Sequence, residues 1–101
     1  MEENYNKKME DFYQAILMLE TLEECDRFFN DVCTPRELMS IAQRLQVAKL
    51  LKIKMTYSDI EAITGASTAT ISRVNRFLRH GAEGYELVLD ELIQKDLNKE
   101  D

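Results

Sequence analysis

The sequence predicts an all-helical fold built as one domain. Its 101 residues include only three glycines, one proline and no tryptophan, whereas residues that favour helices over hairpins are abundant. A content of 45% hydrophobic and 32% charged residues is typical of a folded globular chain rather than a disordered one. Because a chain of this length holds a single core, we expect one domain spanning residues 1–101.

The cysteine count and the lack of a long apolar stretch limit where the protein works. Two cysteines, Cys25 and Cys33, are too few for a disulfide scaffold, and the first residues lack the basic start and apolar stretch of a secretory signal. Charged residues interrupt every apolar stretch before it reaches the roughly 18 residues that cross a bilayer. We therefore expect a cytoplasmic protein with no membrane partner.

The formal net charge of −6 conceals a basic centre. Residues 1–33 carry three Lys or Arg against nine Asp or Glu, residues 34–80 eight against three, and residues 81–101 two against seven. Phosphate attraction is screened over about 8–10 Å, so local charge decides which segment can approach a nucleic acid. The pattern predicts an acidic N-terminal region, a basic region suited to DNA and an acidic C-terminal helix.

An apolar stripe of unusual width marks the first helix, which we expect at residues 5–22. A helix that packs only on its own core needs a narrower stripe, so we expect a second subunit to cover the other side, with residues 1–33 forming dimerisation helices. The alternative is an ordinary core helix. A short second helix is expected at residues 26–32. The stripe consists of Met9, Phe12, Tyr13, Ile16, Leu17, Leu19 and Leu22.

Three local preferences mark the start of the next helix. Thr34 is a good N-cap, Pro35 suits the first helical position, and Glu37 stands three residues after the cap, as a capping box requires. We expect this helix to end near Leu51. Its expected inward positions are Leu38, Ile41, Leu45, Ala48 and either Leu50 or Leu51, and its outward positions are Arg36, Gln43, Lys49 and Lys52.

A pair of short helices follows at about residues 57–79, and a last helix at about residues 83–97. Thr56 with Asp59 predicts a cap, Gly65 a left-handed turn, and Ser67 or Thr68 the cap of the second short helix. The expected inward residues are Ile60 and Ile63 in the first helix, Ile71, Val74 and Leu78 in the second, and Tyr85, Val88, Leu89, Leu92 and Ile93 in the last.

A short helix, a glycine turn and a second helix that is rich in hydroxyls and arginines are typical of the helix-turn-helix, whose second helix enters the major groove. Small hydroxyls suit phosphates or base edges, Asn75 and Arg76 suit bases, and Arg73 and Arg79 suit the phosphate backbone. Helical hairpins of purely structural use share the spacing. The residues expected to contact DNA are Ser67, Thr68, Ala69, Thr70, Ser72, Arg73, Asn75, Arg76 and Arg79.

Residues 34–78 resemble the Trp repressor superfamily, most closely its Trp repressor-like (YerC/YecD) group. The resemblance implies a six-helix Trp repressor-like fold and an intertwined homodimer. It also implies a transcriptional regulator, expected to be a repressor, whose paired helix-turn-helix heads read a palindromic operator in double-stranded DNA. The segments that carry it are Thr34-Pro35, Ala42-Gln43-Arg44-Leu45, Met55-Thr56 and Gly65-Ala66-Ser67-Thr68-Ala69-Thr70-Ile71-Ser72-Arg73.

The same resemblance implies a pocket for a small effector. Arg44 and Arg73 match the two family arginines that sandwich the indole ring of tryptophan and pair with its carboxylate, and Thr70 matches a pocket threonine. Val74 and Phe77 stand where the repressor has a glycine and a serine, so bulk is added and a hydroxyl is lost. We therefore expect no tryptophan binding, with Phe77 or Val74 filling the pocket, and the sequence identifies no other small-molecule effector.

Other functional classes find less support in the sequence. Cys25, Cys33 and His80 are dispersed and lack a CxxC pair, so we expect no metal and no cofactor. The sequence has no phosphate-binding loop, nucleophile elbow or cluster of histidines and carboxylates, so we expect no enzyme. The remaining alternative is a helical protein-interaction module that keeps the fold without specific DNA binding, which Glu61 and the overall acidity favour.

Overall fold

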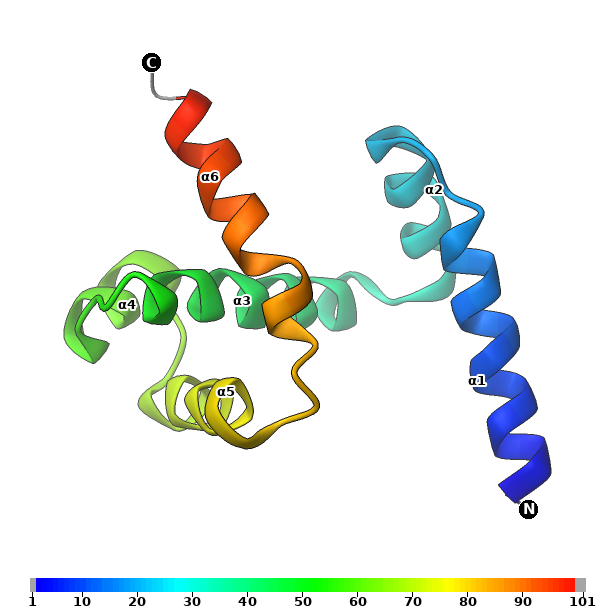
Figure 1. Cartoon of the computed structure of the whole chain (residues 1–101), viewed down its shortest axis with the longest axis horizontal. Helices are drawn as coiled ribbons and strands as arrows, with labels where there is room; N and C mark the ends of the chain where they lie inside the picture. Colours follow the sequence, from blue (N-terminus) through cyan, green and yellow to red (C-terminus); the bar gives the residue numbers. More distant parts are fainter. Residues whose placement is uncertain (1, 100–101) are drawn as a thin grey trace. The chain divides into compact units, whose positions relative to one another are not determined.

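The computed structural model describes residues 2–99, with side chains from residue 5 onward, and this part of the chain contains helices and no strand (Figure 1). The all-helical prediction is confirmed. The chain divides into two compact units, with the boundary between Leu38 and Met39. In chain order the elements are α1 (Glu2–Leu17), α2 (Leu22–Val32), α3 (Pro35–Lys52), α4 (Tyr57–Thr64), α5 (Thr68–His80), the 3-10 turn η1 (Tyr85–Leu87) and α6 (Leu89–Lys99).

The first unit is held together by aromatic side chains of α1 and α2. The rings of Phe12 and Phe28 stack with centroids 6.3 Å apart, and Phe28 meets Phe29 edge-on at 5.3 Å. None of the described side chains of this unit is fully buried, and Leu17 and Leu22 are 79% and 90% exposed. The apolar surface that the sequence predicts is therefore present but uncovered within this unit.

The boundary between α1 and α2 differs from the prediction. The first helix ends at Leu17, and the second begins at Leu22 instead of residue 26. The cause is a local cap, because the Thr21 hydroxyl accepts a hydrogen bond from the Glu24 amide at 3.0 Å. The Glu24 carboxylate accepts one in turn from the Glu20 amide at 2.7 Å. This Thr-x-x-Glu pattern is visible in the sequence and is the signal that the prediction missed.

The predicted capping box at the start of α3 is confirmed. The Thr34 hydroxyl accepts a hydrogen bond from the Glu37 amide at 3.1 Å, and the Glu37 carboxylate accepts one from the Thr34 amide at 2.8 Å. Two hydrogen bonds hold the pKa of Glu37 below its ordinary value of 4.5. The larger effect comes from the bond with the Thr34 backbone and the smaller from the bond with the Thr34 side chain. The carboxylate is therefore stabilised in its charged form, as a capping role requires.

The end of α3 is a left-handed turn without glycine. Lys54 has a φ of 69°, its amide donates to the Leu51 carbonyl at 3.0 Å, and the Met55 amide donates to the Leu50 carbonyl at 3.1 Å. These two bonds form a Schellman motif, in which glycine is the usual residue at the left-handed position. A side chain at that position strains the backbone, so Lys54 is held in place by the surrounding structure.

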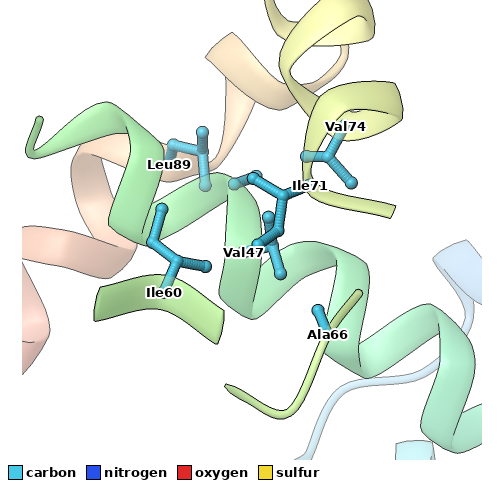
Figure 2. Packing of buried hydrophobic residues seen from close by; sticks show 7 residues of the cluster. Val47, Ile60, Ala66, Ile71, Val74 and Leu89 are labelled. Atoms are coloured by element: carbon cyan, nitrogen blue, oxygen red, sulfur yellow. The ribbon is translucent and has the colours of Figure 1, made fainter. Parts of the chain in front are cut away.

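The core of the second unit joins α3, α4, α5 and α6. Figure 2 shows Val47, Ile60, Ile71 and Leu89 directed toward one another from four helices. Most of these inward positions were predicted, with Val47 and Ala66 as additions. Three predicted inward residues are exposed instead: Ile41 by 52%, Ile63 by 56% and Val88 by 45%. The buried residues of this cluster are Val47, Ala48, Ile60, Ala66, Ile71, Val74 and Leu89.

Ile63 is exposed because α4 packs along the line of Ile60 and Thr64, which lie one turn apart. The Thr64 hydroxyl donates to the Ile60 carbonyl at 2.7 Å, and the Thr64 carbonyl accepts from the Gln43 side chain of α3 at 3.2 Å. Residues one position apart on a helix point about 100° apart, so Ile63 falls beside this line. An eight-residue helix has room for one such line only.

The last helix begins later than residue 83. Glu83 has a φ of 65°, which is incompatible with a right-handed helix, and α6 starts only at Leu89 after the 3-10 turn. Leu89 lies in the core and Lys49 of α3 pairs with Asp96, so packing and charge both attach α6 to α3. Within the described residues, no helix is long and apolar enough to traverse a bilayer.

Candidate nucleic-acid interface

Two capped helices joined by a tight turn carry the predicted DNA-contacting residues. The Thr56 hydroxyl caps α4 by accepting from the Asp59 amide at 3.2 Å, and the Ser67 hydroxyl caps α5 by accepting from the Thr70 amide at 3.1 Å. Gly65 ends α4 with a φ of 74°, and Ala66 follows it into the core. The sequence allowed either Ser67 or Thr68 as the N-cap of α5, and in the structure the N-cap is Ser67.

The turn between these helices is attached to α3. The Ala66 amide donates to the Thr64 hydroxyl at 3.1 Å, while Gln43 binds the Thr64 carbonyl. The polar groups of the turn therefore have partners within the protein, and the turn holds α5 at a defined angle to α4 and α3. Gln43 was predicted to point outward, and its half-buried position is set by this contact.

Helix α5 packs through one face and exposes the opposite one. Ile71 and Val74 are 0% and 2% exposed, and Leu78 packs against the same cluster. Of the predicted contact residues, most are exposed, whereas Thr70 and Asn75 are half-buried at the edges of the core face. The exposed ones are Ser67, Thr68, Ala69, Ser72, Arg73, Arg76 and Arg79.

Arg73 and Arg76 lie against one aromatic ring. The guanidinium carbon of Arg73 lies 5.9 Å from the centroid of the Phe77 ring, and that of Arg76 lies 5.3 Å from it. Among the described residues, neither arginine has a carboxylate within ion-pair distance. Both positive charges are therefore uncompensated on the exposed face of α5, a state that suits contact with an anionic partner.

A basic cavity of about 340 Å³ lies between the end of α3 and helix α5. Its lining includes the apolar side chains of Leu51, Met55 and Leu78 and three cationic side chains. Lys52 and Lys54 come from the end of α3, and Arg79 from the last turn of α5. Both lysines were missing from the predicted contact residues, although the excess of positive charge in residues 34–80 included them.

A second cavity, of about 500 Å³, contains two of the five residues expected to form an effector pocket. Arg44 and Phe77 line it, whereas Thr70 and Arg73 do not. Val74 is buried in the core and does not line this cavity, so of the two side chains expected to fill the pocket only Phe77 reaches it. The side chains around the cavity are those of Ile41, Arg44, Leu45, Phe77, Ala82, Tyr85 and Val88, with Gly84 completing the wall.

The residues considered for a metal site do not come together. Cys25 and Cys33 are free, half-buried thiols in the first unit. Within the described part of the chain, no three His, Cys, Asp or Glu side chains form a group that could hold an ion.

Comparison with known proteins agrees with this geometry. The family model described as Trp repressor protein matches residues 7–93, which is most of the chain. The chain belongs to the Trp repressor protein family. This finding confirms the resemblance seen in the sequence. It supports a helix-turn-helix DNA-binding regulator, since the family consists of regulators rather than enzymes.

Individual relatives also align with most of the chain. The chain is 54% identical over 84 residues to YerC, an uncharacterised protein of Bacillus subtilis (strain 168), with 83% of this chain and 81% of YerC aligned. The crystal structure of a candidate Trp repressor from Staphylococcus aureus matches with a TM-score of 0.82 at 50% identity, covering 85% of this chain and 86% of that one. A TrpR-like protein from Eubacterium eligens ATCC 27750 matches with a TM-score of 0.82 at 52% identity, covering 85% and 89%. The predicted Trp repressor-like fold is thereby confirmed.

Proposed function

We propose that this protein is a homodimeric transcription regulator, most simply a cytoplasmic repressor, that reads a palindromic operator in double-stranded DNA through α5. The observation that carries this proposal is the division of α5 into two faces. Ile71 and Val74 fix the helix in the core, while Arg73 and Arg76 stand exposed on the outer side, where no carboxylate of the described residues lies within ion-pair distance of them. A rigidly held helix with a free cationic face suits insertion into the major groove.

The roles of the individual residues follow from their positions on α5. Arg76 and Asn75 have the donor groups that recognise purine edges, and the hydroxyls of Thr68 and Ser72 lie near the start of the helix, where a groove-inserted helix meets bases. Ser67 and Thr70 are engaged with each other, since the Ser67 hydroxyl donates to that of Thr70 at 3.1 Å. We assign these last two residues to fixing the helix start, with Ala69 in apolar contact with a base.

Phosphate contacts come from the flanks of α5 in this proposal. Arg73 and Arg79 lie on the two sides of the helix, and the basic cavity adds Lys52 and Lys54 beside Arg79. Three cations around one hollow attract the negatively charged non-bridging oxygens of a DNA phosphate more strongly than a single side chain does. The lysines would fix the register of the protein on DNA, and the α5 side chains would supply sequence preference.

Dimerisation is proposed from the first unit. Its described side chains include no fully buried one, although α1 and α2 carry the wide apolar stripe predicted from the sequence. A small unit with an uncovered apolar face gains stability by association. Sedimentation at micromolar concentration should give twice the chain mass of 11.8 kDa, and a monomer whose melting temperature is independent of concentration would refute the dimer.

The experiment that tests the function starts with selection of bound fragments from random or genomic DNA, followed by titration of the selected duplex. Arg73→Ala and Arg76→Ala should weaken binding without changing the melting temperature, because both side chains are exposed. Lys95→Ala removes another exposed cation, from α6, and serves as the control, with unchanged affinity expected.

The dependence of affinity on salt separates the kinds of contact. If the dimer neutralises roughly six phosphates, log affinity should fall against log salt with a slope of about −5, and losing one phosphate contact per subunit should flatten the slope by about two. Unchanged binding by both arginine variants would refute the assignment of α5. A native protein that selects no DNA sequence would favour the helical interaction module instead.

A further inference from the structure

We propose that Phe77 is a positioning residue that holds Arg73 and Arg76 in the conformation that contacts DNA, so that the reading face of α5 is organised without a bound effector. The inference rests on the proposed DNA-binding function. Its basis is that one ring contacts both guanidinium groups, at 5.9 Å for Arg73 and 5.3 Å for Arg76.

The position of Phe77 on α5 explains why one ring can serve two arginines. Arg73 lies one turn before Phe77, and Arg76 directly precedes it in the chain. The three side chains lie on neighbouring parts of the helix surface, since residues four apart nearly align along an α-helix. Phe77 itself is 45% exposed, so it stands between the buried face and the exposed face of α5 rather than in the core.

No other contact of the described residues fixes the side-chain conformations of these two arginines. In the part of the chain that the structure describes, neither has a carboxylate within ion-pair distance, and neither makes a side-chain hydrogen bond. A free arginine loses considerable rotamer entropy when it binds DNA. A guanidinium already placed on an aromatic face by cation–π attraction has lost part of this freedom in advance. The ring therefore raises affinity without itself touching DNA.

The two neighbouring positive charges on α5 make this positioning by the ring more important. Arg73 and Arg76 are neighbours of like charge, and their mutual repulsion favours conformations that spread them apart. The negative face of the Phe77 ring offsets this repulsion by attracting both groups. Leucine at the same position would keep the apolar bulk and the helix propensity but would provide no aromatic face.

The test compares Phe77→Leu with Phe77→Tyr on the selected DNA duplex. The tyrosine variant keeps the ring and should bind as the native protein does. At a contribution of roughly 2- to 5-fold per ring and two rings per dimer, the leucine variant should bind roughly 4- to 25-fold more weakly. Its salt slope should stay unchanged because no charge is removed, in contrast to Arg73→Ala. Melting temperatures of all variants establish that the fold is retained.

A double-mutant cycle measures whether Phe77 acts through the arginines. Phe77→Leu should weaken binding less in an Arg76→Gln background than in the native protein, because only Arg73 then remains on the ring. Equal losses in both backgrounds would show that Phe77 acts by contacting DNA or by packing, and would overturn the positioning role. Equal affinity of the leucine and tyrosine variants would overturn it as well.

A measurement on the free protein separates this inference from the proposed function. The ring current of Phe77 should shift the Cδ protons of Arg73 and Arg76 upfield in NMR spectra, and Phe77→Leu should abolish the shift. Absence of the shift in the native protein would refute the contact while leaving DNA binding intact. If the shift is present but the native protein binds no DNA, the proposed function fails, and the positioning role fails with it.

Discussion

Replacing Ile60 or Ile63 by alanine tests the packing of α4 with a matched pair of changes. Both substitutions remove the same three carbon atoms from the same helix, but Ile60 is 0% exposed and Ile63 is 56% exposed. At about 0.8 kcal/mol per buried CH₂, Ile60→Ala loses about 2.4 kcal/mol of transfer free energy, and the cavity adds about 1–2 kcal/mol. Ile63→Ala should cost about 1 kcal/mol, because less than half of its side chain is buried.

Urea unfolding monitored by circular dichroism measures the difference. With a slope of about 1.5 kcal/mol per molar urea, the midpoint should fall by about 2.5 M for Ile60→Ala and by less than 1 M for Ile63→Ala. All samples must have the same protein concentration, since association of subunits adds to the measured stability. Equal shifts for the two variants would show that α4 is rotated relative to the packing described above, and would refute the reasoning.

Further predictions concern the effector, one cap and two turns. Millimolar L-tryptophan should change neither the melting temperature nor the DNA affinity, because Phe77 stands where the repressor has a serine and its hydroxyl is lost. A ligand at 100 times its Kd would add about 2.7 kcal/mol to the free energy of unfolding, which a thermal-shift measurement detects. Glu37→Gln should lower the urea midpoint near neutral pH, and this difference should shrink as the pH falls below 4.5, because the pKa of Glu37 is lowered in the folded state and its contribution is lost on protonation. Gly65→Ala should destabilise the protein by about 1 kcal/mol through its φ of 74° alone, since nothing lies within 4 Å of the added carbon. Conversely, Lys54→Gly should raise the free energy of unfolding by about 1 kcal/mol by relieving the strain of a positive φ, while weakening DNA binding if the basic cavity holds a phosphate.

The helix starts and stops that depend on neighbouring residues were readable from the sequence. Thr34 with Glu37 and the glycine at position 65 act through hydrogen bonds and backbone angles within one turn, so their effects are encoded locally. The cap at Thr21 was equally local and was overlooked rather than hidden. The inward positions of α5 were also correct, because a 13-residue helix shows its apolar face through its period.

Features that depend on contacts between distant segments required the structure. Lys52 and Lys54 share a cavity with Arg79, although about 25 residues separate them along the chain, and nothing in the local pattern brings them together. The distinction between Val74 and Phe77 is of the same kind. Both are apolar residues on one side of α5. The helix period predicted Val74 as an inward residue, whereas the packing of the neighbouring helices decided that Phe77 stays 45% exposed beside the arginines. The helical period predicts the direction of the inward face only to within about 100°. Whether a single side chain at its border is buried depends on where the neighbouring helices end.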